Sequence, residues 1–245
     1  MPDAIFEDPR LAAVYDALEG ERPDLDVYAA IVDELGARSV LDIGSGTGTF
    51  ACLLASRGVD VTGVDPARAS IDVARSKPGA ETVRWVHGDV TELPDLSVDV
   101  AFMTANVAQV FLTDEEWATT LRAAHRSLRP GGVLVFETRD PARRAWEEWT
   151  PELSRMSVDV AGIGVVESWH EVTDVAGQLV TFRSMTRFDR DNALLESMST
   201  LRFRSRADVE ASLVAEGFTV DEVRDAPDRP GREFVFVARR GDGDS

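Results

Sequence analysis

The stretch Val40-Leu41-Asp42-Ile43-Gly44-Ser45-Gly46-Thr47-Gly48-Thr49-Phe50 decides the fold of this chain. A short apolar run with β-branched residues predicts a strand, alternating glycines predict a tight turn, and a helical pattern follows over residues 47–57. A strand, a glycine turn and a helix begin a nucleotide-type site, because glycine lets a ligand approach the backbone and the first helical turn offers unpaired N–H groups.

The spacing of the glycines discriminates between kinds of nucleotide site. The loop reads G-x-G-x-G, and Thr49 stands where the dinucleotide fingerprint requires a third glycine or an alanine. No G-K-[ST] follows, so the loop is not a P-loop either. These observations favour a ligand without a pyrophosphate, such as an adenosine joined to a small zwitterion.

The rest of the first half alternates between apolar runs and amphipathic patterns. We expect strands at 39–43, 59–64, 81–87, 97–103 and 131–137, and helices at 8–18, 26–35, 47–57, 66–76 and 114–128. Strands separated by helices predict parallel pairing with right-handed crossovers. A helix at 206–216 and two antiparallel strands at 218–223 and 233–239 complete the predicted sheet.

The pattern changes after Pro141. Extended segments at 158–172, 178–190 and 193–203 are separated by turn-forming residues and predict an antiparallel meander. We therefore expect residues 141–203 to form a small β insertion or lid that faces the substrate. Residues 1–140 and 204–240 would form the main domain with its N-terminal helices, and residues 241–245 a frayed tail.

The motif Leu41–Gly48 resembles the first motif of the class I S-adenosylmethionine-dependent methyltransferases, and the resemblance extends from Val27 to Glu137. It implies an α/β fold with a doubly wound, Rossmann-like, seven-stranded and mostly parallel sheet. It also implies S-adenosylmethionine as cofactor, across the tips of the first strands. The expected activity is in-line methyl transfer to a small-molecule acceptor, driven mainly by positioning, since the sulfonium is already activated.

Acidic residues follow three of the predicted strands or stand within them. Asp65 lies 21 residues after Gly44, a spacing at which a carboxylate meets a ribose diol, although it could also cap a helix that begins at Pro66. The resemblance implies that Asp89 and the Val90 N–H contact adenine; an Asx turn is the alternative. It also implies that Asp42 supports the amino end of the methionine moiety, and a brace for the loop is the alternative. The expected cofactor-binding set is Asp42, Gly44, Ser45, Gly46, Gly48, Asp65, Asp89, Val90, Asn106 and Tyr15.

The acceptor side offers fewer signals. Gln109 follows the fourth strand and Arg139 the fifth, where ligands of parallel sheets bind, and Arg139 could hold a carboxylate or only solubilise a helix. The predicted insertion also holds Trp146, Trp149 and Trp169, which could form an aromatic wall or the core of the small sheet. His170 is the candidate general base, because a neutral imidazole is poised near pH 7.

Composition excludes several classes of partner. The net charge is −18, from 26 basic and 44 acidic residues, which disfavours nucleic acids and anionic membranes. The single cysteine, Cys52, allows no internal disulfide, and His and Cys are too few for a metal cluster, although carboxylate-held magnesium stays open. Residues 1–10 lack the apolar core of a signal peptide, so a cytoplasmic location is expected.

Two other functions compete with methyl transfer. An NAD(P)-dependent oxidoreductase would need a glycine at position 49 and a Tyr/Lys or His/Asp pair near the cofactor, and neither is visible. A catalytically inactive S-adenosylmethionine-binding regulator would keep the same motifs. The sequence assigns neither the acceptor, nor the methylated atom, nor the oligomeric state.

Overall fold

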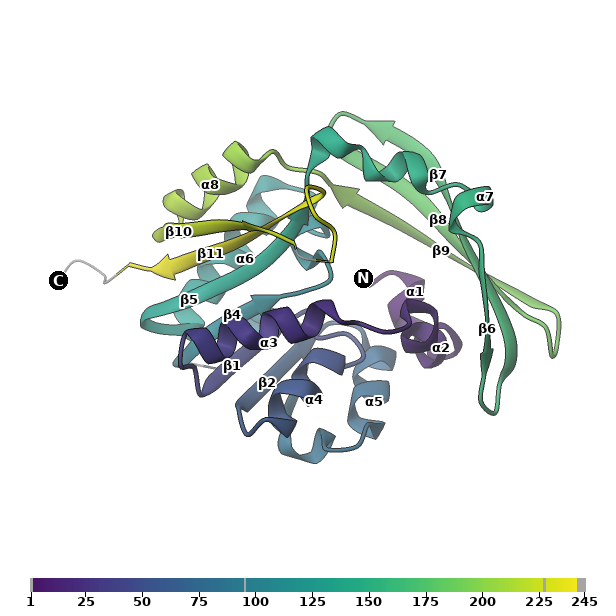
Figure 1. Cartoon of the computed structure of the whole chain (residues 1–245), viewed down its shortest axis with the longest axis horizontal. Helices are drawn as coiled ribbons and strands as arrows, with labels where there is room; N and C mark the ends of the chain where they lie inside the picture. The colour runs from purple at the N-terminus through teal and green to yellow at the C-terminus, as the bar shows by residue number, and fades with distance from the viewer. Residues whose placement is uncertain (1, 95, 227, 242–245) are drawn as a thin grey trace.

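A seven-stranded, mostly parallel sheet forms the centre of the computed structural model, which describes residues 2–94, 96–226 and 228–241 (Figure 1). Its strand order is β10-β11-β5-β4-β1-β2-β3, and β11 runs antiparallel to both of its neighbours. The strands are β1 (Ser39–Ile43), β2 (Asp60–Asp65), β3 (Arg84–His87), β4 (Val98–Met103), β5 (Leu128–Arg139), β10 (Phe218–Asp225) and β11 (Glu233–Arg240). The predicted doubly wound α/β class is confirmed.

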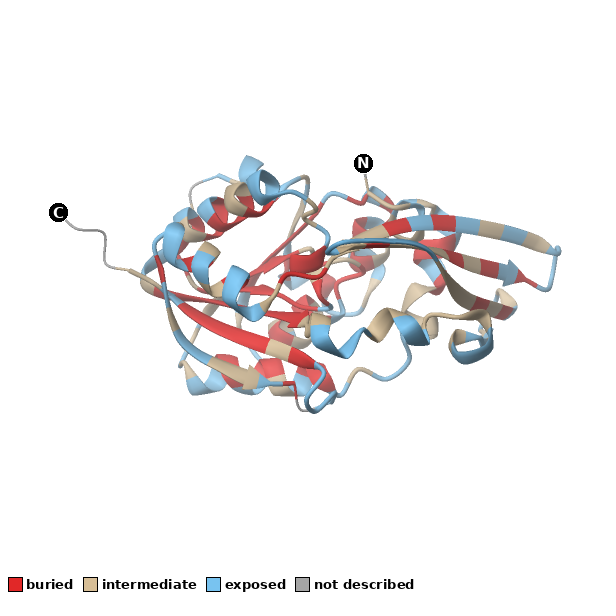
Figure 2. Ribbon diagram, turned by 90° about the horizontal axis from the view of Figure 1, so that it is seen from above, coloured by how far each residue is buried: buried red, intermediate tan, exposed pale blue. Residues whose placement is uncertain are grey.

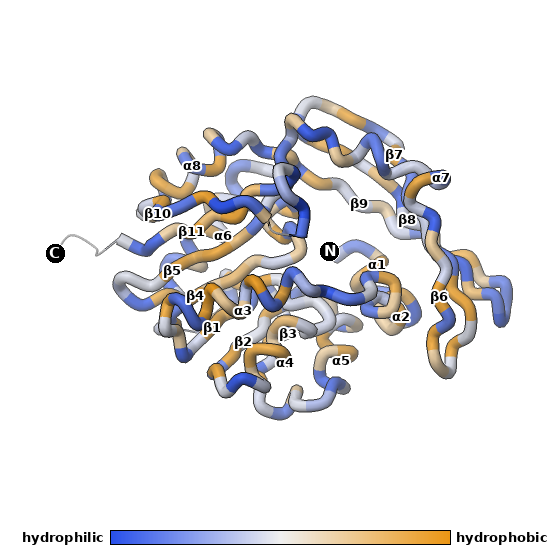
Figure 3. Tube along the Cα trace, in the orientation of Figure 1, coloured by the Kyte–Doolittle hydropathy of each residue, from blue (hydrophilic) through white to orange (hydrophobic). Residues whose placement is uncertain are grey.

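Helices cover both faces of this sheet, so its central strands are apolar on both sides. The helices are α1 (Ala4–Glu7), α2 (Pro9–Glu19), α3 (Asp24–Glu34), α4 (Thr49–Ser56), α5 (Arg68–Ser76), α6 (Asp114–Ser127), α7 (Pro151–Ser154) and α8 (Arg206–Ala215). Val40 of β1 packs with α3 and α4, whereas Leu41 and Ile43 face the side covered by α6 and α8. Figure 3 shows the resulting apolar centre, and Asp42 is a charged residue within it.

A second, four-stranded antiparallel sheet follows in the order β6-β7-β8-β9. Its strands are β6 (Met156–Val160), β7 (Gly164–Ala176), β8 (Leu179–Phe188) and β9 (Ala193–Arg202). Burial alternates along these strands, and Figure 2 shows the alternation as bands of colour.

Several predicted strands have different bounds; β5, for example, extends beyond the predicted 131–137 at both ends, and two other differences have a clear local cause. The segment 158–172 is not one strand, because Gly162 with its φ of 80° turns the chain between β6 and β7. The strand expected at 81–87 begins only at Arg84, since Ala80–Thr82 form a 3-10 turn. The insertion also contains short helical turns at Pro141–Arg143, at Ala145–Glu148 and in α7, which the sequence pattern did not indicate.

The N-terminal helices join the two sheets. Leu11 and Val14 of α2 pack against Val166 and Phe188 of the second sheet in a separate buried cluster. The Ile5 backbone N–H of α1 donates to Ser197 Oγ at 2.8 Å. Asp8 caps α2 as expected, although helical structure begins earlier, at Ala4. Of the predicted frayed tail, residues 242–245 lie outside the described residues.

Candidate functional site

The glycine loop connects β1 to α4 at the carboxyl end of the sheet. Gly46 and Gly48 have φ angles of 52° and 79°, in the left-handed region that favours glycine. A Cβ on Gly48 would lie 2.4 Å from the Trp85 ring, whereas a Cβ on Gly46 would meet no atom within 4 Å. Gly48 therefore serves packing, and Gly46 leaves bare backbone beside a cavity that Gly44 and Ser45 also line.

Asp65 ends β2 and fixes the conformation of this loop. Its Oδ2 accepts from the Gly46 N–H at 2.8 Å, and its Oδ1 accepts from the Ala67 N–H at 2.7 Å. Helix α5 begins only at Arg68, so Asp65 braces the turn before the helix and the loop opposite. Burial raises the pKa of Asp65, and the two backbone hydrogen bonds oppose that rise. The carboxylate lines the cavity, and each oxygen retains a lone pair for a hydroxyl donor.

Asp42 is the buried carboxylate of β1. It is 1% exposed, and neither of its oxygens has a hydrogen-bond partner among the described residues. Burial, and secondarily the nearby Asp65 carboxylate, raise the pKa of Asp42 to about 7. Asp42 does not brace the loop by hydrogen bonds. The neighbouring Ser45 Oγ is also buried without a partner, and such orphan groups call for a water or a ligand.

In the turn after β3, Asp89 forms an Asx turn and also lines the cavity, so the two alternatives considered for it are compatible. Its side chain accepts from the Thr91 N–H at 2.8 Å as the cap of a short 3-10 turn, Val90–Glu92. Asp89 is nevertheless exposed at the cavity wall, and Val90 beside it is buried and also lines the cavity. The Asx turn therefore presents this carboxylate and the adjoining backbone to the cavity.

The loop after β4 has a strained backbone. Ala105 and Asn106 have consecutive positive φ angles of 56° and 60°, which cost energy in residues other than glycine. The buried Glu137 carboxylate holds the turn by accepting from the Asn106 N–H at 3.1 Å. Asn106 lines the cavity, and its Oδ1 has no described partner. Burial, followed by the charge of Glu233, raises the pKa of Glu137 to about 7.

Of the predicted acceptor-side residues, some line the cavity and others do not. Arg139 lines the cavity, whereas Gln109 is fully buried behind it and its Oε1 accepts from Arg139 Nη1 at 3.0 Å. His170 lines the cavity, and its Nδ1 lies 2.9 Å from Ser184 Oγ. Trp169 is not among the residues that line the cavity; it packs under Arg155, whose guanidinium lies 4.2 Å from its ring centroid.

The aromatic part of the wall contains Trp149, which the sequence suggested, and Phe182, which it did not. Trp149 and Phe182 line the cavity with ring centroids 4.7 Å apart, and Phe182 lies 5.9 Å from the His170 ring. Tyr15 lies on the wall as predicted, and burial raises its pKa above the ordinary value. No local motif marks Trp149 or Phe182, because the fold of the insertion brings them to the site.

The lining residues named above, from both the main sheet and the second sheet, surround one cavity of about 1520 Å³. It is larger than the roughly 300–1,000 Å³ of a single small-molecule site, so it has room for two ligands side by side. Among the described residues, no group of His, Cys, Asp or Glu is placed to hold a metal ion. None of the described helices combines the length and apolar character needed to cross a bilayer.

Comparison with known proteins agrees with this geometry. Residues 40–132 match the family model described as "Methyltransferase domain". The chain is 38% identical to the cypemycin N-terminal methyltransferase of a Streptomyces species over 109 residues. This aligned segment covers 44% of each protein. The chain thus spans less than half the length of this curated relative.

Two solved structures resemble the whole chain. The CcbJ methyltransferase of Streptomyces caelestis superimposes with a TM-score of 0.76 at 23% identity, over 96% of this chain and 97% of that one. CalS10 of Micromonospora echinaspora, solved with S-adenosylmethionine bound, gives a TM-score of 0.69 at 23% identity, over 93% and 96%. These likenesses show the fold.

The seven-stranded sheet and its glycine-loop crevice define a Rossmann-like methyltransferase fold. Residues 40–132 are similar to the methyltransferase domain family, in agreement with the resemblance of Leu41–Gly48 to the class I S-adenosylmethionine-dependent methyltransferases.

The residues present fit the cofactor of that family. The open backbone at Gly46 and the braced carboxylate of Asp65 line the cavity, and the orphan carboxylate of Asp42 is buried on β1, the strand that leads into this loop. They offer acceptors for hydroxyl and ammonium donors, as an adenosyl amino acid would require.

Proposed function

We propose that this chain is an S-adenosylmethionine-dependent methyltransferase that acts on a small-molecule acceptor. The observation that supports the proposal best is the continuity of the crevice. The Gly46 loop and Asp65 open into the same cavity as His170, Arg139 and Trp149, so cofactor residues and acceptor residues face one space.

The cofactor half would be held by the loop and the strand tips. S-adenosylmethionine, when bound, supplies an activated methyl group on a positively charged sulfonium. In the proposed arrangement Asp65 accepts hydrogen bonds from the ribose hydroxyls, and Asp89 and the Val90 N–H face the adenine. The charge of the Asp42 carboxylate would compensate that of the ammonium group of the cofactor, through a bridging water. Asn106 and Tyr15 line the same cavity and would complete the cofactor half.

In the acceptor half, His170 would receive a proton and the second sheet would exclude water. Burial lowers the pKa of His170, so its imidazole is neutral near pH 7 and able to accept a proton from the acceptor. The Ser184 hydroxyl at 2.9 Å from Nδ1 fixes the ring orientation. The second sheet covers this chamber and shields the reacting groups from solvent.

The enclosed cavity, the net negative charge of the chain and the proteins that share its fold favour a small-molecule acceptor. The roof contributed by β7, β8 and β9 encloses the chamber, and the net charge of −18 opposes nucleic acids. CalS10, which shares the fold, is described as an amino pentose methyltransferase. The cypemycin relative is by its name an N-terminal methyltransferase, so the acceptor class is a point for experiment.

Binding of S-adenosylhomocysteine by isothermal titration calorimetry tests the cofactor assignment. Asp65→Ala and the milder Asp65→Asn should weaken binding by about tenfold or more, because ribose hydrogen bonds to a charged acceptor contribute roughly 1.5–3 kcal/mol each. Asp60→Ala, at the exposed start of the same strand, should bind like the parent chain. Circular dichroism checks the fold of each variant.

Unchanged affinity in both Asp65 variants would remove the ribose assignment. Tighter binding of NAD than of S-adenosylhomocysteine would overturn the proposal in favour of an oxidoreductase. Turnover of S-adenosylmethionine with a library of small acceptors separates an enzyme from an inactive cofactor-binding protein.

A further inference from the structure

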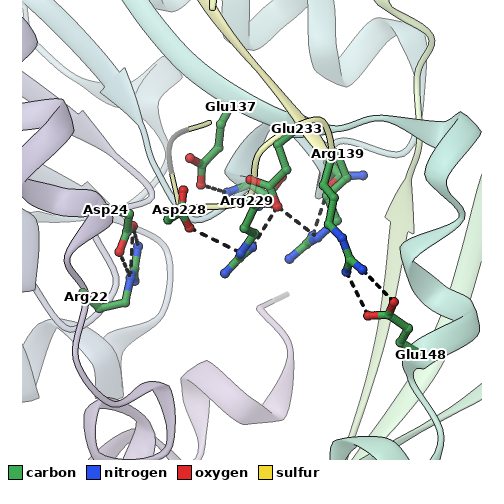
Figure 4. A network of polar contacts seen from close by, with 11 residues as sticks. Arg22, Asp24, Glu137, Arg139, Glu148, Asp228, Arg229 and Glu233 are labelled. Atoms are coloured by element: carbon green, nitrogen blue, oxygen red, sulfur yellow. Dashed lines mark hydrogen bonds and ion pairs between the residues drawn. The ribbon is translucent and has the colours of Figure 1, made fainter. Parts of the chain in front are cut away.

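Arg139 is an unusual cation in the cavity wall. It ends β5, and its side chain is 20% exposed. Its only described hydrogen bond joins Nη1 to the neutral Gln109 Oε1 at 3.0 Å. The carboxylate oxygen nearest to it belongs to Glu233 and lies 3.7 Å from Nε, beyond hydrogen-bond distance. That same oxygen accepts from Arg229 Nη1 at 2.8 Å (Figure 4).

The other described cations of the cavity wall have closer ion pairs than the 3.7 Å contact of Arg139 with Glu233. Arg22 is bidentate on Asp24, with contacts of 2.9 and 2.6 Å. Lys77 Nζ lies 2.6 Å from Asp16 Oδ2. Arg139 therefore differs from both: it lines the cavity, and its guanidinium has donors without a described hydrogen-bond partner. Burying a guanidinium without a matched anion is costly, and an anionic ligand would offset the cost.

An aromatic wall leads from this cation to the imidazole. The Arg139 guanidinium lies 5.5 Å from the centroid of Trp149, which packs on Phe182, and Phe182 in turn contacts His170. A ligand with a flat apolar body could lie along these rings. Its charged end would then meet Arg139 at one end of the wall.

We propose that Arg139 binds a carboxylate of the methyl acceptor, and that Gln109 is the positioning residue that aims the guanidinium. This inference rests on the proposed methyltransferase function and names the acceptor class as an aromatic or otherwise flat carboxylic acid. A planar guanidinium matches a carboxylate with two parallel hydrogen bonds. A single such group, with Glu19 also on the cavity wall, suits a monoanion better than a phosphate dianion.

Matched acid and amide pairs provide the test. Benzoate and benzamide, 4-hydroxybenzoate and its amide, and indole-3-acetate and its amide are titrated calorimetrically into the protein saturated with S-adenosylhomocysteine. At least one acid should bind about tenfold or more tightly than its amide, as a charge-assisted bidentate contact requires. Arg139→Gln should remove that preference.

Three further variants sharpen the result. Arg143→Gln removes a nearby arginine whose side chain is 59% exposed and should leave the preference intact. Gln109→Glu keeps Arg139 but gives it an internal carboxylate, and should weaken acid binding about tenfold. Glu19→Gln removes a repelling charge and should strengthen acid binding.

The outcomes separate this inference from the function on which it rests. Failure of S-adenosylhomocysteine to bind would overturn the proposed function and the inference together. Normal S-adenosylhomocysteine binding with no acid preferred over its amide, or a preference that survives Arg139→Gln, would overturn the inference alone. A preference that survives Gln109→Glu would remove the positioning role of Gln109.

Discussion

At the scale of single residues, Asp42 is the clearest sign that the site is built for a ligand. A carboxylate on a central strand, 1% exposed and without a described hydrogen-bond partner, is destabilising on its own. Its pKa of about 7 means that burial already favours the neutral form. A nearby ammonium group would favour the ionised form again, so cofactor binding and ionisation of Asp42 should be linked.

This linkage predicts a pH-dependent affinity for S-adenosylhomocysteine. Below pH 7 Asp42 must lose a proton when the ammonium binds, so affinity should fall by up to about tenfold per pH unit as the pH decreases. Calorimetry at pH 5.5, 6.5 and 7.5 measures the slope, and buffers of different ionisation enthalpy reveal the released proton. Asp42→Asn should bind more weakly at pH 7.5 and show a flatter profile.

A profile that keeps its slope in Asp42→Asn would assign the titration to another group, of which Asp65 is the nearest. Burial raises the pKa of Asp65 as well. Asp65→Asn measured over the same pH range therefore serves as the comparison. Equal slopes in the parent chain and in Asp42→Asn would contradict the proposed role of Asp42.

Residues of the cofactor crevice were predictable because their signal is local. The glycine loop and Asp65 lie close in sequence, and a strand–turn–helix unit places them together whatever the rest of the chain does. The acceptor side depends on tertiary structure. Trp169 and His170 point to opposite faces of β7, since side chains alternate along a strand, and a sequence without a known register cannot tell which of them faces the cavity.

At the scale of elements, the periodicity of the sequence predicted the strands of the main sheet, but it predicted the insertion only in outline. Parallel strands buried on both faces give continuous apolar runs that sequence alone reveals. The insertion contains a tight turn at Gly162 and short helical turns before α7, each too short to produce a period. Those turns nevertheless place Trp149 on the cavity wall, a position that the sequence could suggest but not distinguish from a place in the core of the small sheet.

The second sheet is joined to α2 by a small cluster of its own, and this predicts partly independent opening. Phe188→Ala should cost about 3–5 kcal/mol locally, as for other large-to-small core changes. Hydrogen exchange should then increase in α2 and β6–β9 while β1, β4 and β5 stay protected. Phe236→Ala, in the core of the main sheet, is the matched control and should lower protection throughout.

Exchange that rises equally in β1, β4 and β5 of Phe188→Ala would show that both sheets open as one unit. The contacts of α1 make the local outcome the expected one. Phe6 and Ile5 tie α1 to α5 and to β9, so this helix bridges the two sheets without being part of either core. Loosening the second sheet should therefore leave the cofactor crevice formed.

At the scale of the whole molecule, buried carboxyl groups set how stability varies with pH. Asp42 and Glu137 have folded-state pKa values of about 7, well above those of unfolded chains. Where the folded pKa of an acid is raised, the folded state binds more protons, so the free energy of unfolding falls as pH rises from about 4 to 7. Asp99 acts in the opposite sense. Desolvation of its carboxylate is outweighed by hydrogen bonds from Arg129 and from backbone N–H groups, which lower its pKa to about 2. The stability that Asp99 contributes is therefore present above about pH 4 and is lost as the pH falls toward 2.

The ligand-free chain should therefore lose stability between pH 5 and 8, and Glu137→Gln should reduce that loss. Near pH 5 glutamine resembles the protonated acid and the variant should unfold like the parent chain. Near pH 8 the ionised Glu137 beside Glu233 destabilises the parent chain, and the variant should be more stable by up to about 3 kcal/mol. Thermal and urea unfolding across this range measure the difference, with Glu152→Gln on exposed α7 as the control. A variant that is less stable than the parent at pH 8 would show that Glu137 is ionised and needed there, because the Asn106 N–H and the cation of Arg229 would then outweigh the cost of burying its charge.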